Sequence, residues 1–280
     1  MTSEPLPPPP PTPPEEGIEI RSHFVRSRNA VVIRACLSEL YVDYFLHLSE
    51  HQLKPAGEHI QLFKDALAAF VLHCTARPRY EMIAWTMHFE NPAVNLFLTA
   101  DTPEEMVTGR ILAENVREMG GNHLYSDVVQ HNKPPRRSAI PFEGADAFRA
   151  AETFYLQSEQ RPARFFATAP EEFVMVCDHP DCDTEWFNSL TPEILREIDH
   201  TETLALLERR RYAWRCGCNQ AKIMRVLAPA MRHDPSELFG DEATVQVSCP
   251  RCAAKHIVTR ESMEAFVAQH PLPPKDETGK

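Results

Sequence analysis

The sequence lacks several features that would place the chain in a common class of proteins. No apolar run approaches the roughly twenty residues of a membrane-spanning helix, so we expect no membrane span. Residues 1–16 are rich in proline and have neither a basic start nor an apolar stretch, so we expect no signal peptide and a reducing, cytoplasmic setting. Glycine is also scarce, with nine among 280 residues.

The marks of an enzyme are absent as well. The sequence contains no phosphate-binding loop, no serine-hydrolase elbow and no pair of catalytic carboxylates in a supporting context. None of the thirteen histidines forms a ligand-spaced pair beside the cysteines. We therefore expect a binding protein without catalytic residues.

Four of the eight cysteines form two tight pairs near the C-terminal end. Cys216 and Cys218 enclose a single glycine, which lets the backbone curl so that both sulfurs face one ion. Cys249 and Cys252 form a C-x-x-C knuckle. Four thiolates on two short turns suit zinc, which binds each sulfur at about 2.3 Å. The sequence therefore predicts one Zn²⁺ held by these four cysteines.

Spacing alone leaves the role of this cluster open. It is typical of a closed structural zinc site, of two disulfides, or of a sensor in which oxidation releases the metal and forms disulfides. A reducing compartment disfavours permanent disulfides. His233 and His256 lie between or beside the pairs, but four thiols already satisfy the metal. We interpret Cys177 and Cys182, with four residues between them, as ordinary loop cysteines.

Charge is unevenly distributed along the chain. The formal net charge of −11 makes nucleic acid an unlikely partner for the whole chain. Residues 209–260 nevertheless carry ten basic and four acidic side chains. Zinc with four thiolates has a net charge of −2, which nearby cations offset. A nucleic-acid-binding zinc module stays open as an alternative.

Periodicity predicts an α+β fold with an N-terminal antiparallel sheet and packed helices over residues 18–188. Apolar spacing indicates helices at 60–74 and 146–157, with Cys74 as a small buried residue. Residues 1–17 and 270–280 are expected to be disordered proline-rich tails. The expected strands are 18–20, 30–33, 81–89, 93–100 and 106–113.

The C-terminal part is expected to contain a helical linker and a small zinc domain. The linker, residues 189–212, should hold two helices, the first capped by Thr191 and the second ending in the basic run 209–211. The zinc domain, residues 213–269, should contain helices capped by Asn219, Asp234 and Thr259. A hairpin should surround the Cys249 knuckle.

Two motifs in this order resemble the heat shock protein 33 (HslO) family. The first is the Cys-x-Cys pair followed by a helix, a short acid-capped helix, a Val-x-Val strand and Cys-x-x-Cys. The second is the stretch from Tyr155 to Pro162, which is similar to a Tyr-x-x-Ser-Glu-Gln-x-Pro stretch of that family. The resemblance covers roughly residues 142–268. The N-terminal domain is divergent, because the family usually carries several glycines there.

The resemblance implies a redox-regulated holdase, a chaperone that binds unfolding client proteins when its zinc-thiolate centre is oxidised. It implies a metastable linker at residues 189–212, redox disulfides among Cys216, Cys218, Cys249 and Cys252, and a homodimer of the oxidised chain. We expect each disulfide to form within its own motif, because close neighbours in the sequence meet most often once zinc leaves. The alternative is a constitutive zinc-ribbon interaction module.

Overall fold

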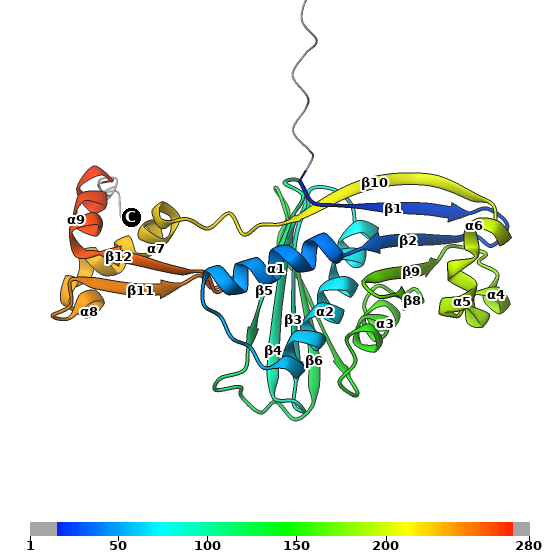
Figure 1. Cartoon of the computed structure of the whole chain (residues 1–280), viewed down its shortest axis with the longest axis horizontal. Helices are drawn as coiled ribbons and strands as arrows, with labels where there is room; N and C mark the ends of the chain where they lie inside the picture. Colours follow the sequence, from blue (N-terminus) through cyan, green and yellow to red (C-terminus); the bar gives the residue numbers. More distant parts are fainter. Residues whose placement is uncertain (1–15, 271–280) are drawn as a thin grey trace, which may run out of the picture.

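A continuous ten-stranded sheet runs through the part of the chain that the structure describes, residues 16–270 of this computed structural model (Figure 1). One half is antiparallel and is formed, in spatial order, by β7 (Arg136–Phe142), β6 (Asn122–Gln130), β3 (Glu81–Phe89), β4 (Val94–Asp101) and β5 (Met106–Leu112). The other half, also antiparallel, is formed by β10 (Leu204–Trp214), β1 (Ile18–Val25), β2 (Ala30–Cys36), β9 (Glu172–Asp178) and β8 (Ala163–Ala169). A short parallel pairing of β10 with β5 joins the halves.

Helices pack on this sheet, so the predicted α+β class is confirmed. Those of the body are α1 (Ser38–Glu50), α2 (Gly57–Ala76), α3 (Ala147–Gln157), α4 (Thr184–Ser189), α5 (Pro192–Arg196) and α6 (Ile198–Thr201). Within residues 16–270, no helix combines the length and apolar character needed to cross a membrane. The expected tails fall largely in residues 1–15 and 271–280, which lie outside the described part.

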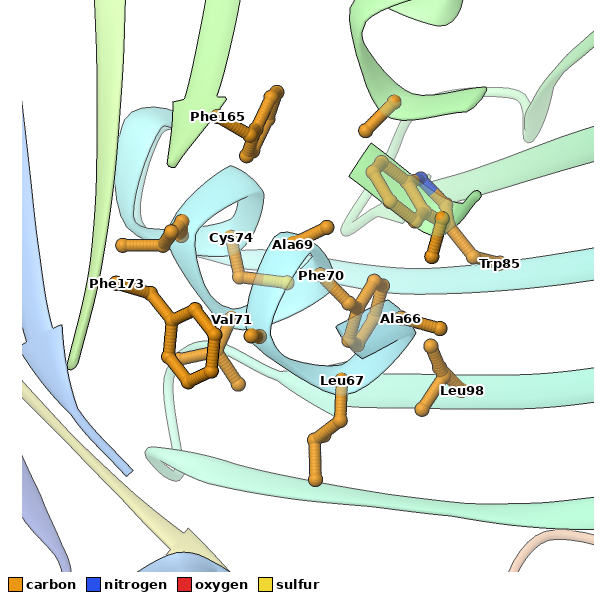
Figure 2. Close-up of a cluster of buried hydrophobic side chains, with 14 of the residues drawn as sticks. Ala66, Leu67, Ala69, Phe70, Val71, Cys74, Trp85, Leu98, Phe165 and Phe173 are labelled. Atoms are coloured by element: carbon orange, nitrogen blue, oxygen red, sulfur yellow. The ribbon is translucent and has the colours of Figure 1, made fainter. Parts of the chain in front are cut away.

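The main core surrounds α2, which is buried on nearly every side from Leu62 to Thr75 (Figure 2). Its side chains pack against both halves of the sheet, including Trp85 on β3 and Phe173 on β9. A helix that is apolar all round belongs in such a position. Cys74 is fully buried within this core, as its spacing predicted.

A second, smaller core lies on the opposite side of the outer half of the sheet. The short helices α4 to α6 contribute Trp186, Phe187, Leu195 and Ile198 to it. Thr191 caps α5 by accepting a hydrogen bond from the Ile194 amide, as predicted. The first half of the expected linker is therefore helical and packed against the body.

The second half of the expected linker is a strand, and the helix predicted to end at residues 209–211 is wrong. Residues 204–214 form β10, which pairs along the whole of β1. Glu19 on β1 lies opposite Arg211, so opposite charges face each other across the two strands. Every second side chain at the end of β10 points into the body and is buried, as expected for a strand; these are Arg210, Tyr212 and Trp214. β10 therefore pairs with the edge of β1 that faces away from β2.

The C-terminal module follows β10 as a separate small body (Figure 1). It consists of α7 (Gln220–His233), α8 (Pro235–Phe239), the hairpin β11 (Thr244–Ser248) and β12 (Lys255–Thr259), and α9 (Arg260–Gln269). The predicted caps Asn219, Asp234 and Thr259 each accept a hydrogen bond from the first turn of their helix. The module has a core of its own, formed by Ile223, Ala228, Met231, Phe239, Val258 and Met263.

Candidate metal centre

Four cysteine sulfurs meet where the C-terminal module joins the body. Cys216 and Cys218 follow the end of β10, and Cys249 and Cys252 lie in the turn between β11 and β12. All four Sγ atoms lie within 4.8 Å of one another. The Sγ atoms of Cys216 and Cys249 are 3.6 Å apart, and so are those of Cys218 and Cys252. Sulfurs on a tetrahedral zinc ion lie about 3.8 Å apart, so the cluster has the size of a zinc site.

Local backbone geometry holds the sulfurs together. Gly217 has a φ of +64°, which is the left-handed conformation that glycine favours, and Lys222 Nζ donates to its carbonyl at 2.7 Å. In the knuckle, the Cys249 amide donates to the Ala254 carbonyl at 2.8 Å, and the Ala253 amide donates back to the Cys249 carbonyl at 2.9 Å. Both turns are thus fixed by hydrogen bonds independent of the sulfurs.

The thiols by themselves do not favour four negative charges. Burial, followed by the neighbouring Cys216 and Cys249, raises the pKa of Cys218 to about 12. The pKa of Cys252 is also raised, through its hydrogen bonds to Cys216 and Cys249, whereas hydrogen bonds from Cys216 and Cys252 lower the pKa of Cys249. A divalent cation removes this conflict because it stabilises all four thiolates together. The donor set therefore fits a zinc ion, and binding itself stays a prediction.

Three side chains of the body contact the knuckle, and sequence reasoning missed all of them. His47 Nε2, on α1, donates to the Cys252 carbonyl at 2.7 Å. His51 Nδ1 accepts from the Lys255 amide at 3.3 Å, and Arg110 Nη1, on β5, donates to the Cys249 carbonyl at 3.2 Å. Burial, and then His47, lower the pKa of His51, which favours the neutral ring that this acceptor role needs. Such contacts join residues more than one hundred positions apart, so no local pattern could have predicted them.

The other residues considered from the sequence lie in different places. His256 Nε2 lies 3.4 Å from Cys218 Sγ, whereas His233 is exposed and 3.9 Å from Glu237. Cys177 lies on β9 and is buried in the main core, so its interpretation as a loop cysteine is wrong, and burial raises its pKa to about 12. Cys182 packs beside the second core instead. These two cysteines therefore face different cores.

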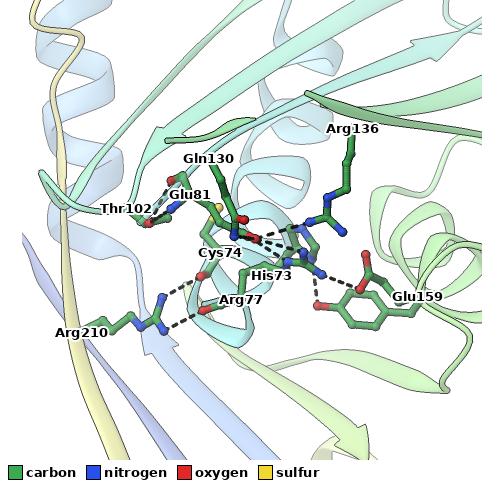
Figure 3. A network of polar contacts seen from close by, with 10 residues as sticks. His73, Cys74, Arg77, Glu81, Thr102, Gln130, Arg136, Glu159 and Arg210 are labelled. Atoms are coloured by element: carbon green, nitrogen blue, oxygen red, sulfur yellow. Dashed lines mark hydrogen bonds and ion pairs between the residues drawn. The ribbon is translucent and has the colours of Figure 1, made fainter. Parts of the chain in front are cut away.

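The second sequence motif, residues 155–162, belongs to a buried polar network in the body (Figure 3). Tyr155 Oη lies 2.9 Å from His73 Nδ1, and Glu159 accepts from Arg77 at 2.6 Å. Arg77 also pairs with the buried Glu81 at 3.1 Å. The motif therefore secures the C-terminal end of α2.

Arg210 completes this network from β10. Its guanidinium donates to the carbonyls of Cys74 and Arg77 at 3.1 and 2.7 Å, as Figure 3 shows. These are carbonyls at the C-terminal end of α2, where a cation is favourable. Part of the basic run 209–211 is therefore used inside the body.

Comparisons with known proteins agree with the two motifs. The family model described as Hsp33 protein matches residues 174–259. A 33 kDa chaperonin of Nitrosococcus oceani is 21% identical over 180 residues, which are 57% of this chain and 62% of that relative, less than two thirds of its length. A 33 kDa chaperonin of Yersinia pestis is 20% identical over 257 residues, which are 80% of this chain and 87% of the relative.

The fold is shared with a solved structure. The crystal structure of a 33 kDa chaperonin, a heat shock protein 33 homologue from Thermotoga maritima, superposes with a TM-score of 0.67. The sequences are 16% identical, and the superposition covers 91% of this chain and 99% of the other. The family model, the curated relatives and the shared fold confirm the resemblance to the Hsp33 family that the two motifs predicted.

Proposed function

We propose that the chain is a chaperone of the holdase type, which binds unfolding client proteins when its four-cysteine centre is oxidised. The names of the curated relatives support a chaperone, and the convergence of Cys216, Cys218, Cys249 and Cys252 within 4.8 Å carries the redox part of the proposal. In this proposal the chain acts by binding rather than by catalysis. It works in a reducing compartment such as the cytoplasm, where the thiols stay reduced until oxidants accumulate.

The resting state holds Zn²⁺ on the four cysteines. A bound zinc ion keeps all four sulfurs as thiolates and contributes roughly 10–16 kcal/mol to the folding of a small four-thiolate module. The cysteines tie the start of the module to its hairpin, since one pair precedes α7 and the other lies between β11 and β12. His256 lies beside Cys218 as a neighbour of the centre.

Activation oxidises the thiolates. Each pair gives up two electrons to an oxidant such as hydrogen peroxide, which takes up two protons and becomes water, and a disulfide forms. The two contacts at 3.6 Å join one motif to the other, so geometry in the closed site does not favour pairing within a motif. We expect pairing of Cys216 with Cys218 and of Cys249 with Cys252, because the site loosens before the second bond closes.

Loss of the centre then weakens the hold of the module on the body. The knuckle supplies the carbonyls of Cys249 and Cys252 that Arg110 and His47 bind, and a loosened turn no longer presents them together. Apolar surface of the body becomes available to clients, and two oxidised chains can associate into a homodimer. The short helices α4 to α6 are a second region that detachment of the module could release from the body.

Aggregation of a heat-labile protein tests this function. The oxidised chain should suppress light scattering by the aggregating protein, whereas the reduced, zinc-loaded chain should have little effect. Equal effects in both states would instead support a constitutive zinc module and contradict the redox part of the proposal. A chain inactive in both states would contradict the chaperone itself.

A further inference from the structure

Three arginines lie next to one another on neighbouring strands of the sheet. Arg21 on β1 is paired with Arg209 on β10 and, on its other side, with Arg34 on β2. Figure 1 shows these three strands side by side. Side chains paired across strands share one face of a sheet, so the three guanidinium groups form a row, here called the arginine row. Like charges at directly opposite positions destabilise a sheet, so the row favours a nearby anion.

The arginine row lies on the face of the sheet that is turned away from the main core. Each arginine adjoins, in its own strand, a residue that is buried on the other side, namely Ile20, Ile33 or Arg210. Val174, which is paired with Arg34, belongs to the second core under α4 to α6. The row therefore borders this second core.

A pocket of about 530 Å³ opens beside the row. Arg21 and Arg34 line it together with His23, Thr168 and Asp199, which lies on α6. This volume is within the range of sites that hold small molecules. Most of the lining side chains are polar or charged, so the pocket suits a charged ligand better than an apolar one. The third arginine of the row extends the basic surface past the rim.

Carboxylates offset only part of this charge. Glu19 Oε1 accepts from Arg21 Nε at 2.5 Å, and Asp199 accepts two hydrogen bonds from the arginine of β2 at 2.5 and 3.0 Å. Glu172 is the third carboxylate in the lining of the pocket. Arg211 lies opposite Glu19 and adds a cation to the same face. Four guanidinium groups therefore stand beside three carboxylates.

His23 lies where the positive charges act together. Its Nδ1 is buried and has no hydrogen-bond partner within residues 16–270. Burial, and then Arg34, lower the pKa of His23; Asp199 opposes them, and Arg21 and Arg209 lower it further. All three members of the row therefore act on one ring. A neutral imidazole can still donate one N–H to a ligand oxygen.

The length of the arginine row indicates the kind of anion. Neighbouring strands lie about 4.8 Å apart, so three guanidinium groups on three strands extend over roughly 10 Å. Each guanidinium can bind phosphate oxygens in a bidentate manner. A single phosphate is too short to contact the whole row, whereas a chain of phosphates can follow it.

We propose that the arginine row and the adjoining pocket bind a di- or triphosphate group, either free or as part of a nucleotide. The site lies on the body, and its ligand is neither a client protein nor the metal. Arg34 already binds Asp199, so the anion and α6 compete for one guanidinium group. Binding also relieves the repulsion within the row.

Isothermal titration calorimetry of the reduced, zinc-loaded full chain with inorganic triphosphate tests the site. Zinc content is measured afterwards, so that chelation of the metal is not mistaken for binding. Triphosphate should bind one site per chain about tenfold more tightly than orthophosphate. Arg21→Gln removes the middle of the row and should weaken binding about tenfold or more. Arg137→Gln is the matched control, because Arg137 is an exposed strand arginine paired with Asp127, and it should bind as the unaltered chain does.

Asp199→Asn tests the competition from the opposite direction. It removes the carboxylate that holds Arg34, so triphosphate should bind about threefold more tightly or better. Arg21→Gln and Asp199→Asn thus change the affinity in opposite senses, which general damage to the fold would not do. Unchanged or weaker binding by Asp199→Asn would show that Arg34 does not hold the anion, and the site as described would be wrong.

ATP distinguishes the two sources of the phosphate chain. An affinity for ATP that does not exceed that for triphosphate supports a site for the phosphates alone, and a higher one supports a nucleotide site. Absence of triphosphate binding, equal affinities of Arg21→Gln and the unaltered chain, or equal weakening by Arg137→Gln would overturn the inference. A single-stranded oligonucleotide that binds more tightly than triphosphate would overturn it too, since the face would then be a nucleic-acid surface. None of these results depends on the aggregation assay, so the proposed function and this site are tested separately.

Discussion

At the scale of single residues, the four clustered cysteines differ from the other four in what surrounds them. Cys249 lies within 4.8 Å of three other thiols, whereas Cys36 is exposed near the Ser38 hydroxyl. Replacing Cys249 by serine removes a soft ligand from the expected zinc site. We predict that Cys249→Ser loses its zinc and that Cys36→Ser keeps one zinc per chain, as measured by metal analysis of the purified variants. Retention of full zinc content by Cys249→Ser would refute the assignment.

His73 makes the body sensitive to acid. It is fully buried, and burial followed by the charges of Arg77 and Arg161 holds its pKa well below the usual 6.5. Below about pH 6.5 the unfolded chain takes up a proton at this residue and the folded chain does not. Its contribution to stability is therefore lost as pH falls, by about 1.4 kcal/mol per pH unit.

We predict that His73→Phe unfolds with a shallower pH dependence between pH 6.5 and pH 5 than the unaltered chain. Urea unfolding followed by tryptophan fluorescence measures this for the body, since all three tryptophans lie at or before residue 214. The variant also leaves the Tyr155 hydroxyl without its partner, so its absolute stability will fall. The test therefore compares the pH dependence of the free energy of unfolding, not its absolute value. An identical pH dependence in both proteins would show that His73 does not cause it.

At the scale of elements, β10 connects three parts of the body. It pairs with β1 and β5, and Arg210 on its inner side caps the C-terminal end of α2. Arg210→Ala removes charge-assisted hydrogen bonds and leaves the carbonyls of Cys74 and Arg77 without this donor. We predict that the free energy of unfolding falls by about 2–3 kcal/mol, whereas Arg209→Ala, at an exposed neighbouring position, changes it by about 0.5 kcal/mol or less. Equal losses in denaturant titrations would contradict the cap.

The same strand shows what the sequence could predict and what it could not. Caps such as Thr191, Asn219 and Thr259 depend on a few adjacent residues, and the structure has them as predicted. Residues 204–214 contain leucines and arginines that favour a helix, yet long-range pairing with β1 makes them a strand. The strands β6 to β9 were not predicted, and the polar, proline-containing residues 132–135 form the turn between β6 and β7. The cysteine cluster was predictable because its turns are local, whereas its contacts with His47 and Arg110 were not.

At the scale of the whole molecule, the account links the metal centre to the body through a small set of contacts. The module has its own apolar core, so it is not held together by the cysteines alone. The cysteines instead fix the knuckle against α1 and β5. Oxidation is therefore expected to act first on docking, and only then on the fold of the module. In this order, oxidation of the four sulfurs first undocks the module and thereby exposes apolar surface of the body.

The most direct test follows zinc release and client binding in one sample during oxidation. Peroxide is added to the reduced, zinc-loaded chain, a chromogenic chelator reports the released metal, and aliquots are assayed for suppression of aggregation. The account predicts that one zinc per chain is released and that suppression rises in parallel, and that reduction with added zinc reverses both. Full release of zinc without any suppression, or full suppression before zinc is released, would contradict the claim that loss of the metal centre activates the chaperone.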